Sequence, residues 1–310
     1  MNKTIIADLH NHSSFSDGEY LPEQLVLKAS QLGLKAVGLT DHDTIDGLKE
    51  ALYAGGKYQI EVIPGIEVSI RFKRSFFTGT LHVLLYFSPN LIDNIEFQND
   101  IKTIIGKGRG VELTKTRVNS INKEFGPEGK NPYLPRKLLP EELLNLCSNA
   151  SRRHFAIAFE KNFKIADKKA ITMLIGNNSP SYIPSGIELS NLKTLIEKYQ
   201  VVTVLAHPAA GSFPGESHYK EVHPPLAIVE KLIPDFINPQ IFGLDGIEIY
   251  YPAHTKQLRN TLFNWAKRYN LIITGGSDCH DTLERPVGIE GVNIKELDIL
   301  KNRIYLKNLP

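Results

Sequence analysis

The chain has 310 residues, of which 42% are hydrophobic and 23% charged, and its formal net charge is +2. This composition excludes a mainly disordered or collagen-like chain, and the even charge gives no whole-chain argument for binding to a membrane surface or to nucleic acid. Two cysteines, Cys147 and Cys279, exclude a disulfide framework. No apolar run approaches the roughly 20 residues of a membrane helix, and no signal-like stretch opens the sequence. We therefore expect a soluble, cytoplasmic protein.

Strand and helix patterns alternate over the first 90 residues. Short apolar runs bounded by polar residues predict the strands, and apolar residues at helical spacing predict the helices. Such alternation is typical of a parallel sheet or barrel. The predicted strands are 4–9, 36–39, 61–66 and 81–87, and the predicted helices are 22–33 and 45–54.

The alternation stops after residue 90 and is replaced by helical patterns as far as about residue 183. Glycines and prolines between residues 126 and 140 interrupt the helices. We therefore expect a helical insertion at 91–183. Its predicted helices are 91–105, 111–125, 140–147, 151–163 and 167–175.

The α/β alternation resumes in the remainder of the chain. About seven strands in all predict a small or distorted (β/α) barrel. The barrel domain is then expected at 1–90 and 184–310, and residues 211–225 read as a long loop. The predicted elements here are helices 189–199 and 255–269 and strands 201–206, 246–249 and 271–274.

Residues able to bind metal ions follow several of the predicted strands. His10 and His12 are two apart after the first strand, so that in extended backbone they share a face and can bind one metal. Asp278 and His280 repeat that spacing after the last strand. Active sites of barrels lie at the carboxyl ends of the strands. Any one of these residues alone is better read as an ordinary polar side chain, but their shared position predicts a site.

Seven segments together resemble the PHP (polymerase and histidinol phosphatase) superfamily, in the expected order. The resemblance covers nearly the whole chain and is closest to the stand-alone phosphoesterases that act on nucleotides. It implies a distorted seven-stranded barrel, a smaller helical domain and a trinuclear metal centre. The segments are DLHNHSSFSDG, GLTDHDTIDG, VIPGIEVS, LHVLLYF, RRHFAIAF, LAHP and TGGSDCHD.

The resemblance also implies a ligand set for two to three divalent ions. One ion would be held by His10, His12, Glu67 and Asp278. A second would be held by Asp17, His42 and His280. The third would share Glu67 as a bridge and add His82 and His154.

Two of these ligands rest mainly on the resemblance. His82 begins a predicted strand instead of ending one, and it reaches Glu67 only if the strands around them pair as a hairpin; the alternative is an ordinary core histidine. His154 lies in the basic run Arg152–Arg153–His154, which by itself is better read as a solvated helix face.

Further residues are candidates for contacting substrate. His207 ends a predicted strand and could donate a proton to the leaving oxygen or bind the phosphoryl group, or could be a turn histidine. His254 could also face the site, whereas His218 and His223 in the 211–225 loop are expected to be exposed. Basic residues of the insertion could hold a second phosphate, because arginine suits bidentate phosphate recognition. These are Arg109, Arg117 and Arg152.

Charge and ligand type lead to a functional hypothesis. Three carboxylates against three divalent ions leave a centre near +3, which suits a phosphate dianion, and mixed nitrogen and oxygen ligands favour Mn, with Fe or Zn as alternatives. We expect hydrolysis of a phosphomonoester of a small nucleotide, a nucleoside 3′,5′-bisphosphate or monophosphate, by attack of a metal-bridging hydroxide. The alternatives are a 5′–3′ exoribonuclease on short RNA, a histidinol phosphatase and a non-catalytic metal-binding module. The oligomeric state is not predicted.

Overall fold

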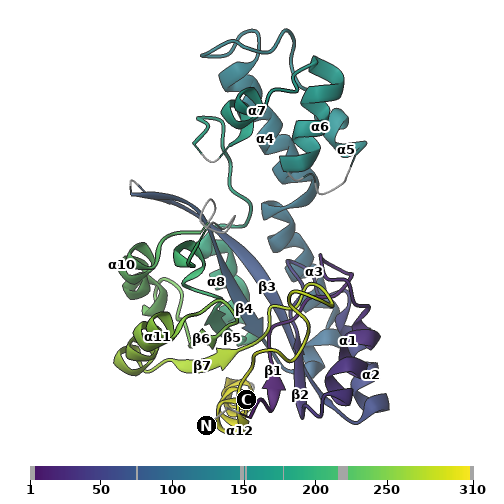
Figure 1. Cartoon of the computed structure of the whole chain (residues 1–310), viewed down its shortest axis with the longest axis vertical. Coiled ribbons are helices and arrows are strands. Elements are labelled where there is room, and N and C mark those ends of the chain that lie inside the picture. The colour runs from purple at the N-terminus through teal and green to yellow at the C-terminus, as the bar shows by residue number, and fades with distance from the viewer. Residues whose placement is uncertain are drawn as a thin grey trace.

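The computed structural model describes residues 4–74, 76–146, 150, 152–176, 178–215 and 223–307. Cys147, the end of the predicted helix 140–147, and His218 lie outside these residues. Figure 1 shows a body that contains the strands and, above it, a lobe of helices. Within the described ranges, no helix combines the length and the apolar character that crossing a membrane requires.

Seven strands form one sheet that is nearly closed into a barrel, as the sequence predicts. The sheet order follows the chain order. The two edges meet beyond the ends of the first and last strands, where Leu9 N–H donates to the Gly275 carbonyl at 3.2 Å and Asn11 forms a parallel bridge with Cys279. The strands are β1 (Ala7–Asp8), β2 (Ala36–Leu39), β3 (Glu61–Arg74), β4 (Phe77–Tyr86), β5 (Val202–Leu205), β6 (Gly246–Tyr250) and β7 (Ile272–Gly275).

The barrel is distorted because β4 runs antiparallel to both of its neighbours. β3 and β4 form a long hairpin in which Ser69 is paired with His82. Glu67 lies two residues before Ser69, so Glu67 and His82 share one face of the hairpin. The hairpin on which the placement of His82 depended is therefore present. Both strands extend beyond the predicted ranges 61–66 and 81–87 into the loop that joins them.

Helices cover the barrel and build the lobe. Helices α10 and α12 are not predicted from the sequence, because the first follows a proline pair at the end of a long loop and the second lies beyond the last alternating strand. The helices are α1 (Pro22–Gln31), α2 (Leu48–Tyr58), α3 (Ile95–Ile105), α4 (Gly110–Phe125), α5 (Pro140–Leu144), α6 (Arg152–Phe163), α7 (Lys168–Ile175), α8 (Leu189–Tyr199), α10 (Leu226–Ile237), α11 (Lys256–Tyr269) and α12 (Ile294–Lys307), with short 3₁₀ turns at η1 (Pro89–Asp93), η2 (Gly106–Gly108) and η3 (Ala210–Ser212).

The lobe has its own hydrophobic core. Phe125 of α4, Phe155 and Phe159 of α6 and Leu174 of α7 are buried against one another. Helix α3 packs differently, because its buried side chains, such as Phe97, join the core of the barrel. The helical lobe that packs as a unit is therefore α4 to α7 (Figure 1), and α3 belongs with the barrel although it lies inside the predicted insertion.

Candidate metal centre

The predicted metal ligands of the barrel meet at one end of it. His10 and His12 follow β1, His42 follows β2, and Glu67 and His82 lie on the β3–β4 hairpin. The loop after β7 supplies Asp278 and His280. Parallel strands end at the same edge of a sheet, which is why residues far apart in sequence converge here.

Gly276 allows the loop after β7 to pack directly on the backbone that follows β1. A Cβ atom at this position would lie 2.3 Å from the His10 nitrogen, closer than any real contact. The same approach lets the Asp278 N–H donate to the His10 carbonyl at 2.8 Å. Asp278 adopts a positive φ of 50°, a conformation that costs a non-glycine residue energy and is found most often at functional sites.

A first donor group consists of four buried residues whose ligand atoms all lie within 4.8 Å of one another: His10, His12, Glu67 and Asp278. His12 Nε2 lies 3.1 Å from Asp278 Oδ1 and 3.2 Å from Glu67 Oε2. His10 Nε2 lies 3.3 Å from each of the same two oxygens. These four residues are those that the resemblance assigns to the first ion.

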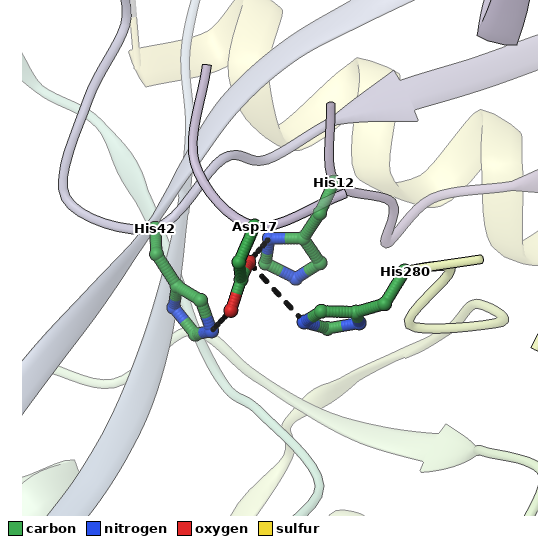
Figure 2. A group of neighbouring side chains, drawn as sticks. All are labelled: His12, Asp17, His42 and His280. Carbon is green, nitrogen blue, oxygen red and sulfur yellow. Dashed lines mark ion pairs between the residues drawn. The ribbon is translucent and has the colours of Figure 1, made fainter. Parts of the chain in front are cut away.

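A second donor group surrounds the Asp17 carboxylate. Figure 2 shows His12, His42 and His280 turned toward Asp17 from three sides. The shortest separation is 3.4 Å, between His280 Nε2 and Asp17 Oδ1, and the other two histidines lie 3.8 and 4.0 Å away. The structure thus brings together the three ligands expected for the second ion and adds His12.

The third set of donors differs from the expected one. His82 Nδ1 and His207 Nε2 each lie 2.9 Å from Glu67 Oε1. The nitrogens of His82, His207 and His223 form a third donor group. His207 therefore faces Glu67 and belongs to the third donor group. His223 is 4% exposed, so the expectation that it is exposed is wrong, because its backbone folds back onto η3.

His154 is not in any of the donor groups formed by the described residues. It lies at the start of α6, and Figure 1 shows this helix in the lobe, apart from the strands. The structure thus places His207 and His223, and not His154, beside His82.

The donor set fits divalent cations. Glu67 Oε2 is buried, and among the described residues no hydrogen bond reaches it, although ring nitrogens of His10, His12 and His42 lie 3.1 to 3.3 Å away. Several donors that converge on one buried oxygen without hydrogen-bond geometry are the arrangement that a bound cation satisfies. Imidazoles and carboxylates without thiolates suit Mn, Fe or Zn.

The charges of the carboxylates dominate the electrostatics of this centre. Burial lowers the pKa of His12, but the hydrogen bond with Asp278 and the charge of Glu67 raise it overall to about 9. Burial raises the pKa of Asp17, yet the hydrogen bond with His280 and the charge of His42 hold it below its usual range. The cluster thus concentrates negative charge that a divalent cation can neutralise. At His223, burial lowers the pKa well below its usual value, so its imidazole is neutral.

The sequence interpretation missed three residues that contact the ligands. Glu248 of β6 is buried, and its Oε1 lies 3.0 Å from His10 Nδ1, while its Oε2 accepts from the His207 backbone N–H at 2.8 Å. Arg285 and Tyr251 both donate to Asp278 Oδ2. Glu248 has a signal in the sequence, since it is a lone acidic residue within the apolar strand GIEIY. Arg285 and Tyr251 lie in loops and have none.

A groove with a volume of about 710 Å³ leads from the second donor group to the start of α4. Asp17, His42, Arg109 and Gly110 are among the residues that line this groove. Arg109 forms an ion pair with Asp43 and donates to Ser69 Oγ at 3.1 Å. The predicted substrate residue Arg109 is therefore at this groove.

Arg117 and Arg152 line a second, narrower pocket in the lobe. Arg117 Nε donates to the Ile183 carbonyl at 2.9 Å, and Arg152 stacks over the Tyr182 ring. Burial and the positive charges of Arg152 and Arg109 lower the pKa of Arg117 to about 10, against a smaller raising effect of Tyr182. The three predicted arginines are thus close enough to act on one another electrostatically.

His254 does not reach the metal-binding cluster. It is 3% exposed and its Nδ1 donates to the Ile249 carbonyl at 2.9 Å. It is not in any donor group of the described part of the chain. The structure therefore gives it a contact with the barrel backbone, and its predicted contact with substrate remains untested.

Comparison with known proteins agrees with this geometry. Residues 8–152 match the model of the PHP domain. The chain is 29% identical over 280 residues to a 5′-3′ exoribonuclease of Haemophilus influenzae, covering 88% of this chain and 89% of the relative. It is 24% identical to a 3′,5′-nucleoside bisphosphate phosphatase of Chromobacterium violaceum, and this alignment covers 88% of this chain and 86% of the relative. The chain therefore contains a PHP domain over residues 8–152.

Solved structures support the PHP fold over the whole chain. A predicted metal-dependent phosphoesterase from Bifidobacterium adolescentis superposes with a TM-score of 0.62 at 22% identity, with 96% of each chain covered. The PHP domain, together with donor groups suited to several metal ions, indicates a metal-dependent phosphoric ester hydrolase.

Proposed function

We propose that the protein hydrolyses a phosphomonoester of a small nucleotide that carries two phosphate groups, a nucleoside 3′,5′-bisphosphate. One phosphate would lie at the metal-binding cluster and the other near Arg109, Arg117 and Arg152. The observation that carries the proposal is that Arg109 and Arg152 act electrostatically on Arg117, and that Arg109 lines the groove next to the second donor group, because a monophosphate needs no second cationic site. The name of the relative from Chromobacterium violaceum points to the same substrate.

The arginines suit a second phosphate for electrostatic reasons. Besides burial, the positive charges of Arg152 and Arg109 lower the pKa of the partly buried Arg117, whereas Tyr182 raises it. An anion close to these guanidinium groups would offset their mutual repulsion. The acidic residues of the groove outside the donor groups have basic partners: Asp43 with Arg109, Asp46 with Lys102, and Glu112 with Lys115.

The groove also offers room for a nucleoside between the two phosphate positions. Phe15 lines it and its side chain is 45% exposed. An exposed aromatic ring beside a phosphate site can stack on a base of any sequence. Gly110, which also lines the groove, begins the long helix α4, where the positive end of the helix dipole favours an anion.

The ligands proposed for the metal ions are the residues of the donor groups: His10, His12, Asp17, His42, Glu67, His82, His207, Asp278 and His280. When bound there, divalent ions, with Mn favoured, lower the pKa of water and neutralise charge on the phosphoryl oxygens. Glu67 would fix the spacing between neighbouring ions, since it lies within reach of five imidazoles. Arg109 would orient the substrate.

The proposal assigns different roles to the two parts of the chain. The barrel, at 1–90 and 184–310, would hold the metal ions, and the insertion at 91–183 would supply Arg109, Arg117 and Arg152 for the second phosphate. The low number of cysteines, with Cys279 buried and free, supports a reducing compartment such as the cytoplasm.

A comparison of two substrates tests the proposal. Phosphate release from a nucleoside 3′,5′-bisphosphate and from a nucleoside monophosphate is measured with wild-type protein and with Arg117→Met. We expect wild type to prefer the bisphosphate, and the variant to lose about 10-fold or more in kcat/KM for the bisphosphate alone, the size expected for one charged hydrogen bond. Lys123→Met, which removes an exposed cation of the same helix, serves as the control. Equal losses on both substrates would contradict a second phosphate site at Arg117.

A second candidate function is exonucleolytic cleavage of short RNA from its 5′ end. The relative from Haemophilus influenzae, which is named for this activity, favours it, as does the exposed Phe15 beside the groove. The test is a short 5′-phosphorylated RNA in the same assay. Stepwise release of mononucleotides at a higher kcat/KM than that for the bisphosphate would make the exonuclease the main function.

A further inference from the structure

We propose that His223 is a metal ligand and completes a three-histidine site with His82 and His207. The inference rests on the metal centre proposed above and adds to it a ligand that lies just before α10. The site would take a divalent transition-metal ion, since neutral imidazoles suit Mn, Fe and Zn.

The geometry of the three rings supports a shared ion. The His223 ring lies 4.9 Å from that of His82 and 5.3 Å from that of His207, measured between centroids. Both rings meet it nearly edge-on, at 80° and 87°. One nitrogen from each of the three residues lies within 4.8 Å of the other two. Rings held edge-on can direct nitrogen lone pairs to a common point, which stacked rings cannot.

The Glu67 carboxylate lies beside two of the three histidines. Glu67 Oε1 lies 2.9 Å from both His82 Nδ1 and His207 Nε2. Three histidines and one carboxylate oxygen form a coordination set that is common for these metals. Because Glu67 Oε2 faces the first donor group, the two oxygens of one side chain would connect the new site to the rest of the centre.

The backbone around His223 is built to hold it in this place. Gly211 of η3 packs so tightly on the returning chain that a Cβ there would lie 2.2 Å from the Pro224 oxygen and 2.5 Å from the His223 oxygen. Ser212 Oγ accepts from the Leu226 N–H at 2.8 Å. His207 lies three residues before η3 and hydrogen-bonds its first residue, Ala210. One short turn thus fixes both His207 and His223.

Burial argues that the position of His223 is functional. Its side chain lies among titratable groups and is 4% exposed, although the loop that carries it leads to the surface helix α10. A buried polar ring needs polar groups around it, and the imidazoles of His82 and His207 are among those that face His223. Ligation of an ion gives those three rings a common partner.

Metal analysis tests the proposal. Wild-type protein, His223→Gln and His223→Ala are loaded with Mn²⁺, freed of excess metal and analysed for ions per chain. We expect both variants to hold one ion fewer than wild type. Substitution with Co²⁺ gives a second readout, since loss of a histidine ligand changes the visible absorption of one ion per chain. His254→Gln is the control, because it removes a buried histidine outside the donor groups.

The outcomes separate this inference from the metal centre itself. An unchanged ion count and Co²⁺ spectrum in folded His223→Gln, with a reduced count in Glu67→Gln, would overturn the role of His223 and leave the centre intact. If wild type binds no ions, the centre fails and His223 fails with it. Circular dichroism identifies a variant that has unfolded, and Gly211→Ala then replaces it, since displacing the loop should also lower the count by one.

Discussion

Arg285 Nη1 donates to Asp278 Oδ2 at 2.7 Å, while Asp278 Oδ1 faces the imidazoles of His10 and His12. Tyr251 donates to the same Oδ2 atom at 2.9 Å. The carboxylate is therefore held with one oxygen turned toward the metal centre and the other toward two fixed donors. Residues that orient a ligand in this way affect metal affinity almost as strongly as the ligands do.

Replacing Arg285 with methionine should weaken metal binding. We expect the dissociation constant of the ion held by the first donor group to rise about 10-fold or more. This is typical when a residue that orients a metal ligand is removed. Equilibrium dialysis against Mn²⁺ measures it. Arg268→Met, which removes a cation that stacks on Tyr269 at the end of α11, should leave the constant unchanged. Equal affinity in Arg285→Met and wild type would refute the orienting role.

Tyr251→Phe should act through the same oxygen as Arg285→Met. Because both donors fix one rotamer of Asp278, we expect the double variant to lose less affinity than the sum of the single losses. The dialysis measurement above gives all four values of this double-mutant cycle. Strictly additive losses would show that the two donors act on different parts of the site.

Glu248→Gln should also weaken the centre, by a different route. The Glu248 carboxylate accepts from His10 Nδ1–H and from the His207 backbone N–H, so it sets the tautomer of His10 with Nε2 free for a metal. Glutamine retains one acceptor and loses the charge. We expect an affinity about 10- to 100-fold lower, measured by competition with a chelator. Glu290→Gln, at a carboxylate paired with Arg259 away from the centre, is the control.

Residue pattern and chemistry could predict the barrel and most of the donors. Strand alternation placed His10, His12, His42, Glu67, Asp278 and His280 at one end of the barrel, because carboxyl ends of strands meet in space. His207 was seen as a site residue, but its contact with Glu67 depends on the closing curvature of the sheet. Linear sequence gives no measure of that curvature.

Other features could not be read from the sequence for a common reason. His223 follows a stretch of sequence that contains prolines and glycines, and its burial depends on the approach of Gly211 to the returning backbone. Arg285 depends in the same way on the path of an irregular segment. His154, in contrast, was assigned through the resemblance alone, and the structure places it in the lobe on α6.

Gly276→Ala should disturb the centre without touching a ligand side chain. The added Cβ would meet backbone atoms of His10 at 2.3 to 2.8 Å, which cannot give way without moving the loop or β1. We expect a loss of about 1–3 kcal/mol in the free energy of unfolding, as for overpacking elsewhere, and weaker metal binding. Urea unfolding and metal analysis measure the two effects.

The matched control for that substitution is Gly56→Ala. Gly56 lies in α2, and no atom lies within 4 Å of a Cβ built there. Alanine is favoured over glycine in a helix by up to about 1 kcal/mol. This variant should therefore be at least as stable as wild type. If Gly276→Ala behaves like Gly56→Ala, the close packing of the two loops is not required.

His254 should make the protein sensitive to acid. Burial lowers its folded pKa to about 3, whereas an unfolded histidine has a pKa of about 6.5. Between these values the unfolded state binds more protons, so stability falls as the pH decreases below about 6.5, by roughly 1.4 kcal/mol per pH unit. His254→Gln removes this contribution. Urea unfolding measures the free energy of unfolding of both proteins at pH 7 and pH 5. Between these two pH values it should fall by about 2 kcal/mol more in wild type than in the variant. Equal decreases in the two proteins would contradict a buried, neutral His254.

The most direct test of the account is the dependence of hydrolysis on the number of ions bound. Chelated protein is titrated with Mn²⁺, and phosphate release from a nucleoside 3′,5′-bisphosphate is measured together with the ions bound per chain. The account predicts no hydrolysis without metal and hydrolysis that appears as the donor groups fill. It also predicts that Glu67→Gln shows no hydrolysis as long as its donor groups hold no Mn²⁺. Full activity in metal-free protein, or in Glu67→Gln without bound ions, would contradict it.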